Sequence, residues 1–452
     1  MATRLDSPAA ATPHARGARP NARAFDAVSL LVLIAILRVA LPSRLVFEPL
    51  GGAGTPASIL GIVALVWWIY ARIVPGSGLA RGRQPVRIAL AIFLTAAIIS
   101  YILAFTGRFI QTNEVNNADR TLIGFASMAG IALLCADGIE SIARLNTLLK
   151  WLFGLSGLLA FFGLVQFFTG FDIATVMQVP GLTENFGIDD NVARSLFRRI
   201  SVTAAHPIEF GVFLACIWPL AVHYALWSRN RSQQTVRWFA VAMISVALMM
   251  TLSRSAILGV GVAGIVIIAP WSWRRRVNAL AVIVIFTASM RLFVPGLVGT
   301  LRGLFLQVQS DSSFQARTDR YPAAFGFIHD SPWFGRGVGT LLPENLYPVV
   351  PLDNQLLATT IEIGLVGLVA LVTMFVIGIA TARGARRRAT ETETKELAQA
   401  LAASLAACFV SFATFDAAAY PMVIGAFAFA LGCAGALWRL TGEDRRRRAS
   451  LH

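Results

Sequence analysis

Twelve long stretches of apolar residues constrain this chain more than any other feature of its sequence. A helix needs about 20 such residues to cross roughly 30 Å of hydrocarbon, and fewer where neighbouring helices shelter it. Only helices and closed barrels satisfy their own backbone polar groups inside a bilayer. We therefore predict an all-α, polytopic membrane bundle of about twelve transmembrane helices, at residues 27–45, 56–74, 87–106, 121–137, 149–168, 207–227, 237–253, 254–270, 278–294, 356–381, 397–415 and 419–440.

Composition agrees with a membrane protein. Of the 452 residues, 56% are hydrophobic and 14% are charged, whereas roughly a quarter of the residues in a soluble chain are charged. All four cysteines lie inside apolar stretches without CxxC spacing, which is typical of small core residues and not of disulfides or metal ligands.

The basic residues follow the apolar stretches in a regular alternation. With the N-terminus placed inside, 26 of the 39 Lys and Arg residues lie in segments on the inner side. Positive charge in short loops marks the cytoplasmic side of a membrane, so we predict an inner-membrane protein with both termini in the cytoplasm. This topology also explains the net charge of +15 without nucleic acid. The segments are 1–26, 72–87, 137–150, 228–237, 271–277, 382–396 and 439–452.

The predicted organisation is one transmembrane domain between two tails. Residues 1–26 are rich in Ala, Pro and Arg and are expected to be a disordered cytoplasmic tail. Residues 27–440 form the transmembrane domain, and 441–452 are a basic cytoplasmic tail. Two outward segments, 169–205 and 292–355, are long, and the second is a large periplasmic-side loop between helices 9 and 10. Loops of this length are usually functional.

Arginines on the outward side are the first candidate site residues. Arg254 follows Thr251-Leu252-Ser253 in a tight turn between two apolar stretches. It either snorkels to the interface or faces a shared cavity, because charge at membrane depth rarely faces lipid. Arg317 and Arg320 flank Asp319 closely enough to form a loop salt bridge, but two guanidinium groups aimed at one place would bind a diphosphate.

A third cluster precedes the sixth predicted helix. It consists of Arg194, Arg198 and Arg199, and the spacing of the first two predicts a shared helical face.

Acid–base candidates lie near the same helix ends. His206 stands before Pro207, with Glu209 one turn further on, and is either a helix cap or a reacting group. Asp353 and Asn354 open the tenth predicted helix, where both residue types are good N-caps. Glu362 lies two turns inside that helix, where an ionised carboxylate needs a partner.

No nucleotide-binding loop, dinucleotide fingerprint or metal-spaced set of ligands occurs in the sequence. We therefore expect no cofactor and no metal. A reaction on the outward face would use a donor that is already activated and is delivered through the lipid.

Several short motifs resemble the O-antigen ligase and O-antigen polymerase family of membrane glycosyltransferases in polysaccharide biosynthesis. The resemblance runs from about Arg199 to Leu368, and the first five helices match only in hydropathy. Its motifs are Thr251–Ser255, Ser313–Arg320, the glycine-rich Asp330–Gly339, and Asp353-Asn354-Gln355 followed by Glu362–Gly367.

The resemblance implies a metal-independent, inverting transfer of glycan at the outer face of the membrane. The donor is a glycan on undecaprenyl diphosphate, and the acceptor is a sugar hydroxyl of a saccharide or glycolipid. Arg254 and Arg317 match the arginines that hold the diphosphate. Arg199, His206, Asp319, Arg320, Asn354 and Glu362 are the further candidates for binding donor or acceptor.

The chain departs from the family pattern at the head of the tenth helix. Lipopolysaccharide ligases typically carry a histidine before the asparagine, whereas this chain has Asp353. A carboxylate can act as the base, and His206 stays open as an alternative. The change favours a polymerase, or a ligase for another acceptor, over a strict lipopolysaccharide ligase. The rival from another class is a flippase of lipid-linked oligosaccharide.

Overall fold

The computed structural model describes residues 26–74, 79–107, 111–185, 193–194, 197–228, 230–306, 321–342 and 353–450. These residues are almost entirely helical. The long helices are α1 (Ala27–Ala40), α2 (Pro56–Ile73), α3 (Pro85–Gly107), α4 (Thr112–Gly138), α5 (Ile142–Thr169), α7 (Pro207–Leu226), α8 (Arg231–Met250), α9 (Arg254–Ile268), α10 (Trp273–Phe293), α14 (Gln355–Arg388), α15 (Thr392–Phe412) and α16 (Pro421–Ala449).

Each of the twelve apolar stretches overlaps one of these helices. Within the described ranges, nine helices are long and apolar enough to cross a membrane, and α1 and α9 are shorter apolar helices. The all-helical membrane architecture is thus confirmed, while the count of twelve spans stays a prediction. The first stretch was expected to reach residue 45, but α1 ends at Ala40 because Leu41, which precedes Pro42, is extended.

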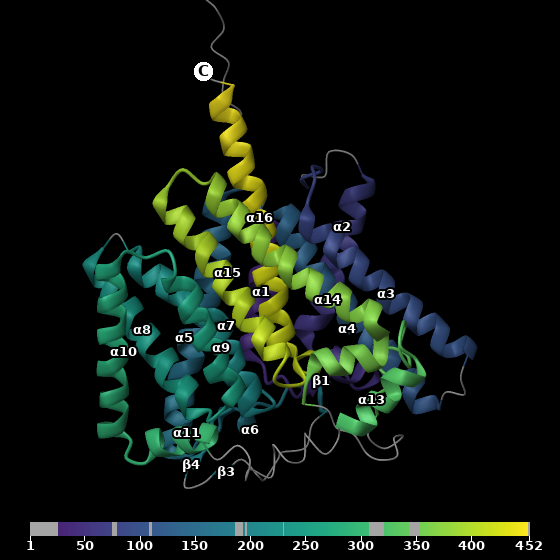
Figure 1. The fold of residues 1–452 in the computed structure, drawn as a ribbon, viewed down its shortest axis with the longest axis horizontal. Helices are drawn as coiled ribbons and strands as arrows, with labels where there is room; N and C mark the ends of the chain where they lie inside the picture. The colour runs from purple at the N-terminus through teal and green to yellow at the C-terminus, as the bar shows by residue number, and fades with distance from the viewer. Residues whose placement is uncertain are drawn as a thin grey trace, which may run out of the picture.

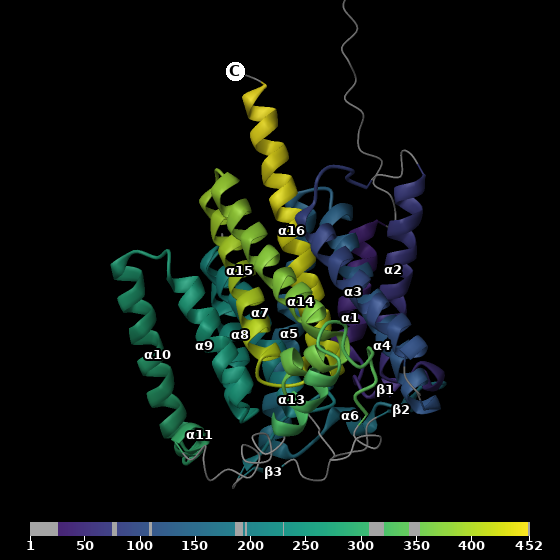
Figure 2. The same cartoon turned by 45° about the vertical axis from the view of Figure 1, so that its right-hand side comes forward.

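The helices stand side by side in one bundle with small elements gathered at one end (Figures 1 and 2). The C-terminal end of α16 lies at the opposite end. The small elements are η1 (Glu48–Gly54), α6 (Ile173–Val176), α11 (Leu297–Leu306), α13 (Tyr321–Asp330) and two antiparallel strand pairs, β1 (Leu45–Val46) with β2 (Thr183–Glu184) and β3 (Ala193–Arg194) with β4 (Phe197–Arg198). We call this end the loop end.

Small residues allow the helices of the bundle to approach closely, as is common where lipid supplies no hydrophobic driving force between helices. A Cβ at Gly130 in α4 would lie 2.1 Å from the carbonyl oxygen of Gly61 in α2. Aromatic rings fill the wider space between α14, α15 and α16, where Phe375 packs against Phe412 and Phe427 with ring centroids 5.1 and 4.5 Å apart.

Two helices depart from this compact arrangement. α10 stands at the edge of the bundle in both views, and none of its residues is buried. α14 is broken at Gly364, whose φ of 78° lies in the left-handed region. The break leaves backbone N–H and C=O groups of an apolar helix without helical hydrogen bonds. These groups are hydrogen-bonded instead by the segment that follows α13.

Candidate functional site

The turn predicted at Thr251–Ser255 joins α8 to α9 at the loop end. Ser253 caps α9, since its hydroxyl accepts a hydrogen bond from the Ala256 N–H at 3.3 Å. Arg254 is the first residue of α9 and is half-buried. The guanidinium therefore leaves the helix at its N-terminus, where the backbone carries partial positive charge.

Arg199 lies at the same turn. Its Nε donates a hydrogen bond to the Thr251 carbonyl oxygen at 2.8 Å, and the side chain is buried. Two of the predicted arginines, Arg199 and Arg254, thus belong to one structural unit. An arginine that binds the backbone of a turn also fixes the direction of the helix that follows it.

The prediction that Arg194 and Arg198 share one face of a helix is wrong. Arg194 lies in β3 and Arg198 in β4, and the two strands form an antiparallel pair in which Arg194 is opposite Phe197. A spacing of four residues fits a helix turn, but it also fits a hairpin with a two-residue connection. Here the backbone groups pair across the hairpin.

His206 caps the N-terminus of α7, which was one of the two roles predicted for it from the sequence. Its Nδ1 accepts a hydrogen bond from the Ile208 N–H at 3.1 Å. The ring lies 6.2 Å from that of Tyr420, which precedes α16. The imidazole therefore stands between the first turns of α7 and α16.

Glu209, one turn into α7, joins three segments of the chain. Its Oε2 accepts hydrogen bonds from the Ser43 hydroxyl at 2.9 Å and the Ala205 N–H at 2.7 Å. Its Oε1 accepts one from the Met422 N–H at 2.8 Å, in the first turn of α16. The carboxylate is fully buried and attracts Arg38 of α1 electrostatically. Glu209 is thus a structural anchor of the loop end.

Of the two residues predicted to cap α14, Asp353 and Asn354, only Asn354 does so. The Asn354 side chain accepts hydrogen bonds from the backbone N–H groups of Leu356 and Leu357 at 3.0 and 3.2 Å. Asp353 precedes this cap and is exposed. Asn354 therefore performs the structural task, and the Asp353 carboxylate is not needed for it.

The connection between α15 and α16, residues 413–420, brings these helix ends together. The Ser255 hydroxyl of α9 donates a hydrogen bond to the Thr414 carbonyl oxygen at 3.3 Å. Gln355 of α14 makes two hydrogen bonds to the same connection. Its backbone N–H donates to the Phe415 carbonyl oxygen at 3.2 Å, and its side-chain Oε1 accepts from the Ala418 N–H at 2.8 Å. The first turns of α9 and α14 are thus hydrogen-bonded to residues 413–420, and α16 begins directly after them.

Asp416 lies in the middle of this connection, and sequence reasoning missed it. The residue is half-buried. Burial, with a smaller contribution from the negative charge of Asp353, raises its pKa to about 7. The only signal in the sequence was a single acidic residue between two apolar stretches, which is also what an ordinary interhelical turn contains.

Glu362 of α14 lies just before the helix break. Its Oε1 accepts a hydrogen bond from the N–H of Leu341 at 3.3 Å, the residue that directly follows the glycine-rich residues 331–340. Its charge and that of Asp416 repel each other. Glu362 therefore links the break in α14 to the connection that holds Asp416.

The glycine-rich segment 331–340 fills the break in α14. Arg336 and Gly337 donate backbone hydrogen bonds to the carbonyl oxygens of Ile361 and Glu362 at 2.7 and 2.9 Å. In return, the Leu365 N–H binds the Pro332 carbonyl oxygen at 2.8 Å. The segment thus satisfies the backbone groups that the break would leave without partners.

The Arg336 side chain has a structural partner of its own. Its guanidinium forms a salt bridge with Glu114 of α4 at 3.0 Å, and Glu114 is buried. Arg336 also stands over the ring of Phe327 in α13, 5.4 Å from the centroid. The motif arginine therefore ties segment 331–340 to α4.

Three predicted site residues, Arg317, Asp319 and Arg320, lie outside the described residues. Of the other candidates, Arg199, His206, Arg254, Asp353, Asn354 and Glu362 all come from elements at the loop end. In the ranges that the structure describes, no group of three or more His, Cys, Asp or Glu side chains could hold a metal ion.

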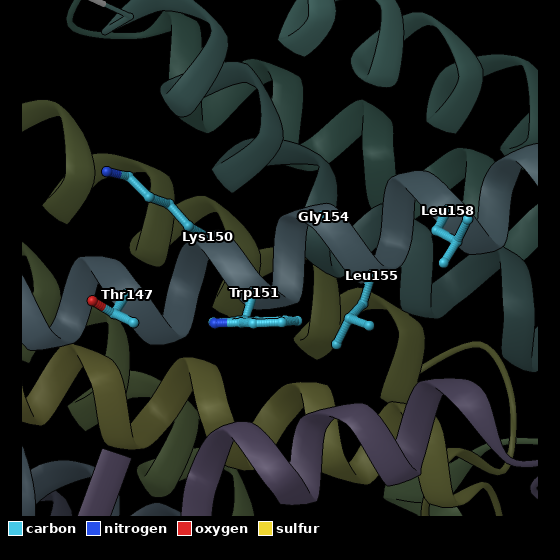
Figure 3. A pocket seen from close by; sticks show the side chains of 6 residues that line it. All are labelled: Thr147, Lys150, Trp151, Gly154, Leu155 and Leu158. Atoms are coloured by element: carbon cyan, nitrogen blue, oxygen red, sulfur yellow. The ribbon is translucent and has the colours of Figure 1, made fainter. Parts of the chain in front are cut away.

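A surface hollow of about 510 Å³ lies elsewhere, along α5 (Figure 3). All of its lining residues come from the stretch 147–158 of α5, and none of them is a predicted site residue. They are Thr147, Lys150, Trp151, Gly154, Leu155 and Leu158. The hollow does not contribute to the chemistry of the loop end.

Comparison with known families supports the resemblance found in the sequence. Residues 238–372 match the model of the family described as O-antigen ligase. The matched range contains most of α8, all of α9, segment 331–340 and the first half of α14. No protein with a curated function matches the chain. The match and the apolar helices together support an O-antigen ligase-like, multi-pass protein of the inner membrane.

Proposed function

We propose that this chain, with its O-antigen ligase-like region, is a membrane glycosyltransferase that moves glycan from an undecaprenyl-diphosphate donor to a sugar hydroxyl. The reaction takes place at the outer face of the inner membrane, where the loop end would lie if both termini are cytoplasmic. The transfer is inverting and needs no metal ion. It either extends a polymer or attaches a glycan to a final acceptor.

One observation carries this proposal, namely that the turn with Arg254 and the head of α14 with Asp353 both adjoin residues 413–420, through Ser255 and Gln355. Arg199 and Arg254 share the turn before α9, and Asp353 precedes α14, beside Asp416. α9 and α14 both begin at this connection, and the N-terminus of a helix favours an anion such as a diphosphate. A carboxylate beside such an anion site can take a proton from a hydroxyl.

The chemistry is a single displacement at the anomeric carbon of the donor. The acceptor oxygen forms a bond to this carbon, the bond to the phosphate oxygen breaks, and the undecaprenyl diphosphate leaves with the electron pair. Arg254, joined by Arg317, stabilises the charge that develops on the leaving group, as preorganised charges do most effectively. The proton of the acceptor goes to a carboxylate of the Asp353–Asp416 pair.

The test is transfer in vitro with purified full-length protein, an undecaprenyl-diphosphate glycan and candidate acceptors, in the presence of EDTA. We expect the activity to survive chelation. Arg254→Ala and Arg317→Ala should each lower kcat/KM about a hundredfold, or about 2.7 kcal/mol. A loss below about threefold in both variants would remove the two arginines from the mechanism.

A matched control is Arg291→Ala, at the exposed end of α10, which removes one arginine from the same chain and should leave transfer unchanged. The length of the product separates the two forms of the reaction. A ladder of increasing polymer indicates a polymerase, and one discrete adduct indicates a ligase.

A further inference from the structure

Asp416 is held in place by contacts on both sides of the connection between α15 and α16. Before it, the Thr414 and Phe415 carbonyl oxygens bind Ser255 of α9 and Gln355 of α14. After it, the Ala418 N–H binds the Gln355 side chain, which is itself buried. An aspartate in an ordinary loop lacks such support, whereas a reacting group requires it.

The Asp416 carboxylate has no structural task among the described residues. It precedes the short helix η4 (Ala417–Ala419) without capping it, and no side chain in the described ranges hydrogen-bonds to it. The carboxylates of Glu209 and Asp137, in contrast, are bound by several donors each. Asp416 keeps its acceptor capacity for a group that comes from outside.

We infer that Asp416 is the proton acceptor of the glycosyl transfer and that Asp353 is a positioning residue beside it. This inference rests on the proposed function. It assigns to Asp416 the task for which the sequence nominated Asp353.

The two aspartates differ in how far they are buried. Asp353 is exposed at the head of α14, whereas Asp416 is half-buried between the first turns of α9 and α14. A sugar hydroxyl that enters between these turns displaces water from Asp416 but leaves Asp353 in contact with solvent. A general base works best when its pKa lies near the working pH, and burial together with the charge of Asp353 brings the pKa of Asp416 to about 7.

The step balances without a further reactant. As the acceptor oxygen bonds to the anomeric carbon, its proton moves to the Asp416 carboxylate, and the donor's bonding electrons leave with the diphosphate. Water then removes the proton from Asp416 before the next turnover. Among the described residues, the charged and titratable groups at the helix ends around Asp416 are Asp353, Glu362, Arg254, Arg199, His206, Glu209 and Tyr420.

The experiment compares Asp416→Asn, Asp416→Glu and Asp353→Asn in the full-length protein, with transfer rates measured across pH. We expect Asp416→Asn to lower kcat about a hundredfold or more at every pH, and Asp416→Glu to recover part of it. Asp353→Asn should keep most of the maximal rate. Because the Asp353 charge raises the pKa of Asp416, removing it should move the acid limb of the profile to lower pH.

Asp172→Asn is the matched control. This aspartate also lies at the loop end, and its side chain accepts a hydrogen bond from the Ala174 N–H, which asparagine can accept as well. Its rate and pH profile should equal those of the wild type. Melting temperature and gel filtration report whether each variant is folded.

An active Asp416→Asn enzyme, within about threefold of the wild type while Arg254→Ala is inactive, overturns the inference and leaves the proposed function standing. If Arg254→Ala and Arg317→Ala are also active, the proposed function itself fails. Should Asp416→Asn not fold, the Asp353→Asn profile decides, since an acid limb that does not move contradicts the inference.

Discussion

Gly364 lies directly against the backbone of Trp333, so closely that a Cβ at Gly364 would be 2.2 Å from the Trp333 carbonyl oxygen. The contact joins the break in α14 to the glycine-rich segment 331–340. Gly335 faces the same junction, where its Cβ would be 2.4 Å from the Glu362 carbonyl carbon. Both glycines also have positive φ. Two segments that the sequence resemblance singled out separately therefore form one structural unit.

Gly364→Ala should disrupt the contact between the break in α14 and segment 331–340. The added methyl group meets backbone atoms that cannot give way, and a positive φ strains any residue with a Cβ, at a cost of roughly 1–3 kcal/mol. We expect a lower melting temperature in detergent and a marked loss of transfer activity. Gly124→Ala in α4 is the control, because a Cβ there meets nothing within 4 Å. A Gly364→Ala protein as stable and active as Gly124→Ala would contradict the packing.

The salt bridge between Arg336 and Glu114 offers a second test of how segment 331–340 is held. Arg336→Met should destabilise the protein by up to about 3–5 kcal/mol, because the buried Glu114 carboxylate would lose the guanidinium of its salt bridge. Adding Glu114→Gln removes that charge, so the double variant should be more stable than Arg336→Met alone. Thermal unfolding of the wild type, both single variants and the double variant measures the coupling. Strict additivity would show that the two side chains do not interact.

Local features of the fold could be predicted from the sequence because they depend on neighbouring residues. Apolar stretches gave the helices, and the turn before Arg254 and the cap before α14 follow from residue types at adjacent positions. The family resemblance likewise rested on short motifs, and the match to residues 238–372 agrees with it.

Features that depend on distant contacts could not be predicted in this way. Arg336 and Glu114 are 222 residues apart, and nothing near either residue in the sequence indicates the other. Asp416 becomes notable only because Ser255 and Gln355 bind the connection that carries it. The hairpin at Arg194 and Arg198 was predicted as a helix because a spacing of four is common to both structures.

Asp26 makes a pH-dependent contribution to stability at the other end of the bundle. Burial alone would raise its pKa, but hydrogen bonds from Arg144 and Ser29 outweigh this effect, so the pKa in the folded protein is lowered. Such a carboxylate stabilises the fold at pH values above its unfolded pKa of about 3.9. The contribution is lost as the pH falls through the lower, folded pKa.

We therefore expect Asp26→Asn to lower the melting temperature at neutral pH and to have a smaller effect as the solution approaches pH 3. Melting curves of the wild type and the variant between pH 3 and 7 test this. Glu443→Gln near the C-terminus is the control, because its salt bridge with Arg439 is partly exposed and such pairs contribute little. A difference between wild type and Asp26→Asn that grows on acidification would contradict the sign of the shift.

Replacing Glu209 even by the isosteric glutamine should destabilise the fold. Both of its carboxylate oxygens accept hydrogen bonds from backbone N–H groups, those of Ala205 and Met422. In Glu209→Gln, either orientation of the amide turns an NH₂ donor toward one of these donors. The buried Arg38 would also lose its nearby negative charge.

We expect Glu209→Gln to cost at least about 1–3 kcal/mol, the penalty of one buried donor without a partner. Transfer should fall as well, because the link from α7 to the first turn of α16 is weakened. Ser404→Ala is the control. The Ser404 hydroxyl is buried in α15 and has no hydrogen-bond partner among the described residues, so its removal should be neutral or stabilising. If both variants unfold like the wild type, the three hydrogen bonds to Glu209 do not support the loop end.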